Sequence, residues 1–105
     1  MKAYPNVVPV PPGEMLDEEF IKPFGLSRAE TARRLGVPAN RITQIIRGTR
    51  AITPETALRL EALFGWPADY WLRNQVEYDL GRERRLRGGR IRKQVRPVKA
   101  TAPHS

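Results

Sequence analysis

The chain has 105 residues, no cysteine and a formal net charge of +8, which allows one small domain and excludes disulfides and thiolate metal sites. No apolar run approaches the roughly 20 residues of a membrane span, and the proline-rich start does not fit a signal peptide. We therefore expect a soluble cytoplasmic protein with no membrane partner.

Five helices and no strand are predicted, so the expected fold is all-α. The first helix falls within residues 11–25, where Leu16 and Phe20 lie one helical turn apart and acidic side chains fill the first turn. The second helix begins at Ser27, a favourable N-cap, and ends at Gly36, which suits a left-handed C-terminal turn.

The remaining three helices carry similar boundary signals. The third begins near Pro38 and ends before Gly48. The fourth follows the N-cap Thr53 and ends at Gly65, and the fifth opens on Pro67 with apolar residues at helical spacing. Because the connecting loops are short, the helices should form a compact five-helix bundle.

The second and third helices, joined by the tight turn "GVP", have the layout of a helix-turn-helix. At about 100° per residue, Ile42, Ile45 and Ile46 fall on one side of the third helix and would pack on the second. Amide and guanidinium groups on the other side are suited to paired hydrogen bonds with adenine and guanine in the major groove. The opposite arc holds Asn40, Thr43, Gln44 and Arg47, and with the neighbouring Arg41 these are the candidates for base contacts.

A basic zone coincides with this hairpin. Residues 27–50 carry six arginines and one glutamate, whereas residues 1–26 and 51–80 are mildly acidic. Such a field attracts a polyanion, although a solvated helical hairpin is the alternative that the pattern leaves open. The candidates for phosphate contacts that flank the third helix are Ser27, Arg28, Thr49 and Arg50.

About residues 11–80 resemble a HigA-type antitoxin, a branch of the phage-repressor (Xre-like) group with its lambda-repressor-like helix-turn-helix. The resemblance is carried by "PGE" at the first helix, by "RITQIIRGTRAITPETALRL", and by "YWL" followed by "YDL". The chain has Pro11 where members of the branch often have a histidine. It has Trp66 where a serine or threonine usually caps the fifth helix.

The resemblance implies a protein with two partners. Such antitoxins bind a double-stranded palindromic operator as homodimers and repress their own operon. They also bind and neutralise a HigB toxin, a RelE-like ribonuclease that cleaves mRNA; a free-standing repressor without a toxin is the alternative. The acidic side chains of the first helix have two possible roles: contact with a basic toxin, or support of the helix dipole and of solubility. Its candidates for contact with a basic toxin are Glu14, Asp17, Glu18 and Glu19.

The homodimer is also expected from the residues themselves. A helix-turn-helix usually reads two half-sites one helical turn apart, so one copy offers too few contacts. The fifth helix carries more apolar surface than a small bundle can bury. We place the dimer interface at Tyr70, Trp71, Leu72, Val76 and Tyr78.

Catalysis is not expected, and neither is a cofactor. The only histidine, His104, lies near the end of the chain, and no G-x-S-x-G, P-loop or paired carboxylates are found. An RNA-binding role of the C-terminal segment is disfavoured, because this segment has no aromatic side chain to stack on bases.

The C-terminal segment supplies the whole net charge. Residues 81–105 hold nine basic side chains and one glutamate. Gly88, Gly89 and Pro97 oppose a long helix, so the fifth helix should end near Leu86. A flexible polycation binds DNA without regard to sequence by releasing counterions; solubility or docking on the toxin are the alternatives. The expected organisation is a flexible arm (1–11), a DNA-binding and dimerisation domain (12–86) and a mobile basic tail (87–105).

Overall fold

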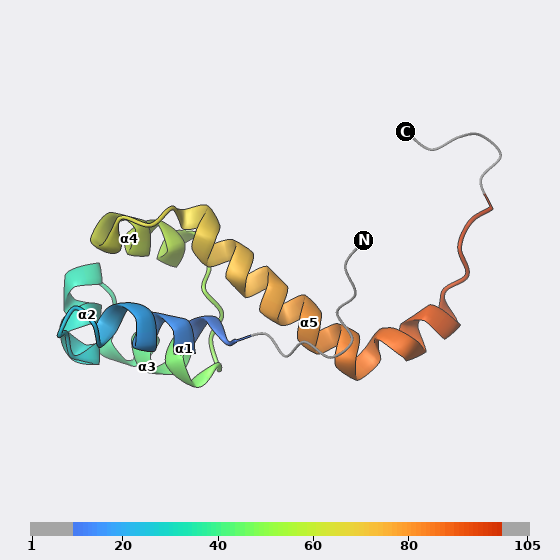
Figure 1. The fold of residues 1–105 in the computed structure, drawn as a ribbon, viewed down its shortest axis with the longest axis horizontal. Helices are drawn as coiled ribbons and strands as arrows, with labels where there is room; N and C mark the ends of the chain where they lie inside the picture. The colour runs from blue at the N-terminus through green and yellow to red at the C-terminus, as the bar shows by residue number, and fades with distance from the viewer. Residues whose placement is uncertain (1–9, 100–105) are drawn as a thin grey trace.

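A computed structural model describes residues 10–99. Figure 1 shows the short helices gathered at one end of the molecule and the long helix extending away from them. The described residues contain no strand, and the predicted all-α fold with five helices is confirmed. The elements are α1 (Pro12–Leu16), the π-helical turn η1 (Asp17–Ile21) that continues it, α2 (Arg28–Leu35), α3 (Ala39–Arg47), α4 (Pro54–Phe64) and α5 (Ala68–Gln94).

Local capping signals set the ends of α2 and α4, as predicted. The Ser27 Oγ accepts a hydrogen bond of 2.9 Å from the Glu30 N–H at the start of α2. The Thr53 side chain caps α4 in the same way, and Gly36 ends α2 with a φ of 74°. Glycine adopts that left-handed conformation without the clash that a Cβ would cause.

One apolar core joins the helices. The α3 residues Ile42 and Ile45 are buried and Ile46 is half-buried, and they share the core with Ala32 and Leu35 of α2. The predicted packing of the third helix on the second is therefore confirmed. This packing holds the opposite side of α3 outward.

Trp71 belongs to this core rather than to a free surface. Its side chain is 0% exposed, and its ring centroid lies 4.7 Å from that of Phe20 and 5.4 Å from that of Tyr70. The prediction that Trp71 contributes to a dimer interface is wrong, because the indole fills the space between α5 and η1. Of the other interface candidates, Val76 is 53% exposed.

Gly13 permits the close approach of α1 to α3. A Cβ built on Gly13 would lie 1.9 Å from the Ile45 carbonyl oxygen and 2.5 Å from the Ile46 Cα. Those are backbone atoms, so rotation of a side chain cannot relieve the clash. The glycine of the "PGE" motif is thus explained by packing.

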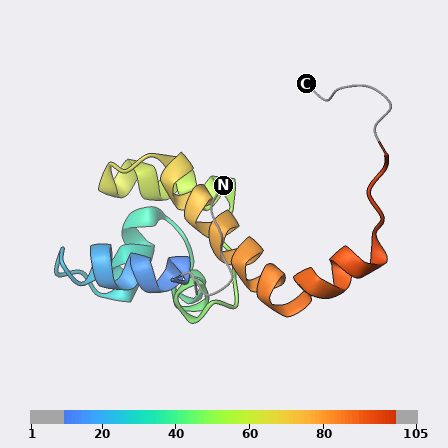
Figure 2. The same ribbon diagram turned by 45° about the vertical axis from the view of Figure 1, so that its right-hand side comes forward.

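The helix α5 is longer than predicted. It runs without interruption to Gln94, through Gly88 and Gly89, so the prediction that it ends before the glycine pair is wrong. A helical glycine costs only about 1 kcal/mol relative to alanine, while strong helix formers surround the pair and Glu83 forms an ion pair with Arg87 one turn later. Figures 1 and 2 show that the helix bends in its C-terminal half. The first part of the expected mobile tail is therefore helical.

Some expectations concern residues that the structure does not describe. The predicted N-terminal arm lies outside the described residues except for Val10 and Pro11, the latter being the N-cap of α1. His104 also lies outside them. Within residues 10–99, no helix combines the length and the apolar character needed to cross a membrane.

Candidate nucleic-acid interface

The outward side of α3 presents the predicted polar arc. Asn40 and Arg47 are exposed, while Thr43 and Gln44 are half-buried, and all four lie opposite the buried isoleucines of this helix. Gly48 ends α3 with a φ of 83°, which turns the chain directly after the arc. The helix therefore offers one amide, one hydroxyl and one guanidinium within reach of a groove, with a second amide beside them.

Two hydrogen bonds join the loop after α3 to Gln44 of that helix. The Arg50 Nε donates a hydrogen bond of 3.0 Å to the Gln44 Oε1, and the Thr49 Oγ1 donates one of 3.2 Å to the Gln44 main-chain carbonyl. The first contact leaves the Gln44 side-chain NH₂ as the group that faces a ligand. Arg50, expected to bind phosphate, thus also orients a candidate base-reading side chain.

Four of the six arginines in the basic zone have acidic partners. Glu30 binds both Arg33 and Arg34, the latter at 2.8 Å. Hydrogen bonds from Arg33 and Arg34 hold the pKa of Glu30 below its ordinary value, and the bond from Arg33 has the larger effect. Arg28 and Arg41 are paired across helices, as described below. Three carboxylates pair with these four arginines, so ion pairing offsets half of the positive charge of the six arginines in the zone.

Arg41, a candidate for base contact, is paired with α4, so a base contact by this side chain stays a prediction. Its Nη1 lies 3.4 Å from the Glu55 Oε1 on α4, and its side chain is only 25% exposed. Its Nε is buried without a hydrogen-bond partner among the described residues. In contrast, Arg47 and Arg50 form no ion pair with any residue that the structure describes. The free positive charge is thus concentrated where α3 ends.

Asp17 and Arg28 form a pair that joins η1 to α2. The Arg28 Nη2 lies 3.0 Å from the Asp17 Oδ2, and the Asp17 side chain is only 8% exposed. The prediction that Asp17 contacts a toxin is wrong, because its carboxylate faces α2 rather than solvent. Glu14, Glu18 and Glu19 are exposed. Arg28 keeps about half of its side chain in solvent, beside Ser27, so a phosphate contact there stays a prediction.

Two contacts that the sequence did not reveal position the hairpin and its loop. The Arg59 Nη1 on α4 donates a hydrogen bond of 2.9 Å to the Leu35 carbonyl, which satisfies one of the terminal carbonyls of α2. The Gln75 Oε1 on α5 accepts a bond of 2.8 Å from the Ile52 N–H in the loop before α4. No local signal marks these residues, because their partners lie 23 or 24 positions away in the chain.

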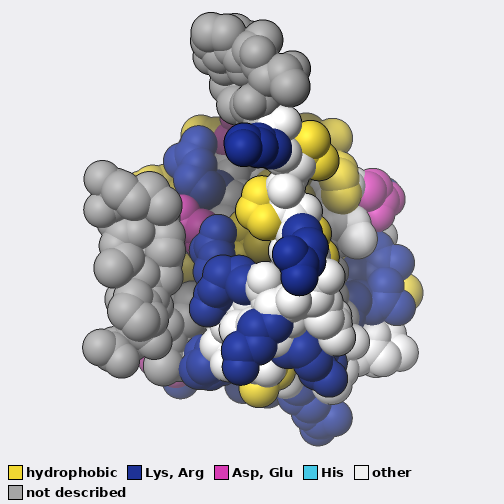
Figure 3. All heavy atoms as spheres, turned by 90° about the vertical axis from the view of Figure 1, so that its right-hand side faces the viewer, with side chains coloured by type: hydrophobic (Ala, Val, Ile, Leu, Met, Phe, Trp, Pro, Cys, Tyr) yellow, Lys and Arg dark blue, Asp and Glu magenta, His cyan; other side chains and the backbone are white. Residues whose placement is uncertain are grey.

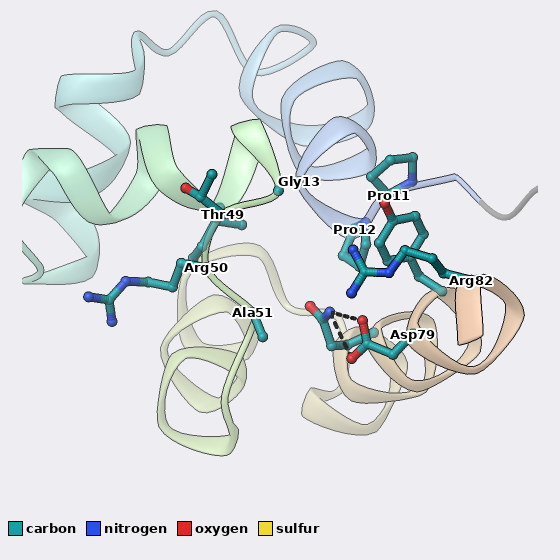
Figure 4. A pocket seen from close by; sticks show the side chains of 12 residues that line it. Pro11, Pro12, Gly13, Thr49, Arg50, Ala51, Asp79 and Arg82 are labelled. Atoms are coloured by element: carbon teal, nitrogen blue, oxygen red, sulfur yellow. Dashed lines mark hydrogen bonds between the residues drawn. The ribbon is translucent and has the colours of Figure 1, made fainter. Parts of the chain in front are cut away.

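Gln75 is itself held by Asp79. The Gln75 Nε2 donates to the two carboxylate oxygens of Asp79 at 3.1 and 3.3 Å, drawn as dashed lines in Figure 4. These groups line a cavity of about 280 Å³ between the start of α1, the loop after α3 and α5. The long helix α5 therefore supports the loop that carries Thr49 and Arg50, because Gln75 accepts a hydrogen bond from the Ile52 N–H in that loop.

Comparison with known proteins places this geometry in a family. Residues 18–71 match the model of the Helix-turn-helix family. The chain is 51% identical over 69 residues to virulence-associated protein I of Dichelobacter nodosus, and the match covers 66% of this chain but only 64% of that protein. It is 36% identical over 72 residues to antitoxin HigA-1 of Vibrio cholerae, covering 69% of this chain and 68% of that protein.

Solved structures agree with these relatives. The Pseudomonas aeruginosa antitoxin HigA with the higBA promoter gives a TM-score of 0.82 at 35% identity, over 87% of this chain and 99% of that one. The antitoxin GraA in complex with its operator gives 0.84 at 33% identity, over 95% and 99%. Fold and site define a helix-turn-helix protein, and the chain belongs to the Helix-turn-helix family. Its resemblance to the HigA-type antitoxins, expected from its motifs, is confirmed.

Proposed function

We propose that this protein is an antitoxin that acts in the cytoplasm on two partners. As a homodimer it binds a palindromic operator with α3 in the major groove and represses its own operon. It also binds and neutralises a RelE-like, mRNA-cleaving toxin of the HigB type. The observation that carries the proposal is the outward polar side of α3 next to the two arginines that lack an acidic partner among the described residues. The likeness to antitoxins solved with promoter or operator DNA supports it.

Removal of one base-reading amide tests the DNA part. On duplexes that the parent protein selects from a random pool, Gln44→Ala and Asn40→Ala should each cost on the order of 1–3 kcal/mol per half-site. Affinity for unselected DNA should change little, because phosphate contacts are kept. Titration of both DNAs measures the effect.

The matched control is Arg33→Ala, which removes an exposed cation that is already paired with Glu30. Its operator affinity should remain close to that of the parent. Arg28→Ala is unsuitable as a control, because it would remove the 3.0 Å partner of the buried Asp17 carboxylate and leave only Lys22 at 3.9 Å. Operator binding by Gln44→Ala at full strength would show that α3 does not read the sequence in this way.

A homodimer formed along α5 is expected in solution. Val76 and Leu80 lie one helical turn apart on α5, and their side chains are 53% and 45% exposed. A second copy would cover this apolar surface. The double variant Val76→Arg/Leu80→Arg should sediment as a monomer at micromolar concentration. Leu58→Arg, at a 61% exposed position on α4, should not. A parent protein that is monomeric at this concentration would contradict the dimer.

The proposed toxin contact lies beside η1. Glu14, Glu18 and Glu19 line an open concavity that Met15 and Tyr70 also border. The Tyr70 hydroxyl lies 2.8 Å from the Met15 sulfur, so the apolar base of this surface is held by a contact between α1 and α5. An acidic rim over an apolar base fits a basic protein partner.

Charge reversal at this surface should slow association with the toxin. The variant Glu14→Lys/Glu18→Lys/Glu19→Lys leaves Asp17 intact, so the ion pair with Arg28 is kept. Because rim charges act mainly on the encounter rate, the association rate constant should fall while operator binding persists. Stopped-flow mixing with a purified basic toxin measures it, with Glu77→Lys on α5 as the control. An unchanged rate would remove this surface from the toxin interface.

A free-standing repressor is the second candidate. The chain is also 36% identical over 72 residues to the HTH-type transcriptional regulator YbaQ of Escherichia coli. Co-expression separates the two functions: rescue of growth from a RelE-like toxin encoded beside this chain supports the antitoxin. Operator binding without rescue by the parent protein supports the repressor.

A further inference from the structure

The C-terminal half of α5 is an exposed cationic helix. The segment Gly81–Gln94 carries seven basic side chains between Arg82 and Lys93 and one acidic side chain, Glu83, for a net charge of +6. All seven basic residues are exposed, and Glu83 is already paired with Arg87. This segment is called the cationic arm below.

The charges of the cationic arm surround the helix. At about 100° per residue, Arg82, Arg87 and Arg92 point roughly 140° apart, so no face is free of positive charge. Figure 3 shows lysine and arginine side chains gathered over this part of the molecule. A helix of this kind cannot fold back on an apolar core. A partner that binds this surface would need negative charge over an extended length.

The cationic arm begins beside the proposed DNA-binding loop. Arg82, its first basic residue, rests over the Tyr78 ring at 5.4 Å and lines the same cavity as Thr49 and Arg50 (Figure 4). From there the helix leads away from the bundle, as Figures 1 and 2 both show. Positive charge is therefore available from the end of α3 to the end of α5.

We infer that the cationic arm binds the backbone phosphates of duplex DNA outside the half-site that α3 reads. The inference rests on the DNA binding proposed above. Fourteen helical residues span about 20 Å, and duplex DNA carries one charge per roughly 1.7 Å of its axis. The arm contains no aromatic side chain that could stack on unpaired bases, so a phosphate backbone is favoured over single-stranded RNA.

The helical state gives the arm a different role from that of a flexible tail. An ordered helix loses less conformational entropy on binding than a flexible chain. Its direction also determines on which side of the half-site the extra phosphates lie. The contact adds affinity without adding base discrimination, because phosphates carry no direct sequence information.

The test compares two double variants of the full chain that have the same net charge. Arg90→Gln/Arg92→Gln removes two charges from the arm, and Lys22→Gln/Arg33→Gln removes two that are paired with glutamates. Each is titrated with random duplex DNA at several salt concentrations. The arm variant should flatten the slope of log affinity against log salt by roughly two units per subunit, and lose about tenfold in affinity at 0.1 M salt for each contact removed.

The control variant should keep the parental slope, and the arm variant should weaken operator and random DNA by the same factor. Because every substituted residue is exposed, both variants should keep the helix content of the parent. An unchanged slope in the arm variant overturns the inference, and so does a loss confined to toxin binding. Random DNA is sufficient as the probe, so a parent protein that shows no operator preference would defeat the proposed function without affecting this comparison.

Discussion

Gly13→Ala should lower the free energy of unfolding by about 3 kcal/mol or more, the upper range for overpacking. The added methyl group would meet the main chain of α3, with the Ile45 carbonyl oxygen only 1.9 Å away. Relief requires α1 to move off α3, which opens the core beneath Leu16. Urea denaturation followed by circular dichroism measures the change.

Gly89→Ala is the matched control for this experiment. A Cβ there would have no neighbour closer than the Arg92 Nη2 at 4.0 Å. Because alanine favours a helix over glycine by about 1 kcal/mol, this variant should be as stable as the parent or slightly more stable. Equal stability of Gly13→Ala and the parent would mean that α1 does not rest on α3 at this distance.

Trp71→Ala should cost about 3–5 kcal/mol, the range for truncation of a large buried aromatic side chain. Trp71 is 0% exposed and belongs to the core cluster that joins α5 to the other helices. The loss should appear at every protein concentration, because the contact lies within one subunit. Trp66→Ala, at a 50% exposed position, should cost much less.

The dependence of the stability of Trp71→Ala on protein concentration distinguishes a core position of Trp71 from a position in the dimer interface. If Trp71 were an interface residue, its replacement would weaken the dimer and leave the isolated subunit stable. Unfolding at two concentrations a hundredfold apart, together with sedimentation, separates these outcomes. A stable Trp71→Ala subunit that no longer dimerises would mean that Trp71 contributes to the dimer interface.

Features whose cause is local could be predicted from the order of residues. Ser27 and Thr53 cap their helices by bonding N–H groups three residues away, and Gly36 adopts its left-handed turn as predicted. The polar arc of α3 follows from helical periodicity alone. These predictions succeed because hydrogen bonds within one turn, and the geometry of one helix, depend only on neighbouring residues.

Which polar and apolar groups are available to a partner depends instead on how the helices pack. The pairs Asp17–Arg28 and Arg41–Glu55 join residues 11 and 14 positions apart, and both remove charges that the sequence presented as free. Trp71 was expected at an interface, but the aromatic cluster around Phe20 encloses it. The packing of the helices against one another determines whether a charged side chain is paired or free. It also determines whether an apolar side chain is buried or exposed. Composition and periodicity indicate which face of a helix is apolar, but they do not show which charged or aromatic side chain of another helix lies against a given residue, because such pairs join segments distant in the chain.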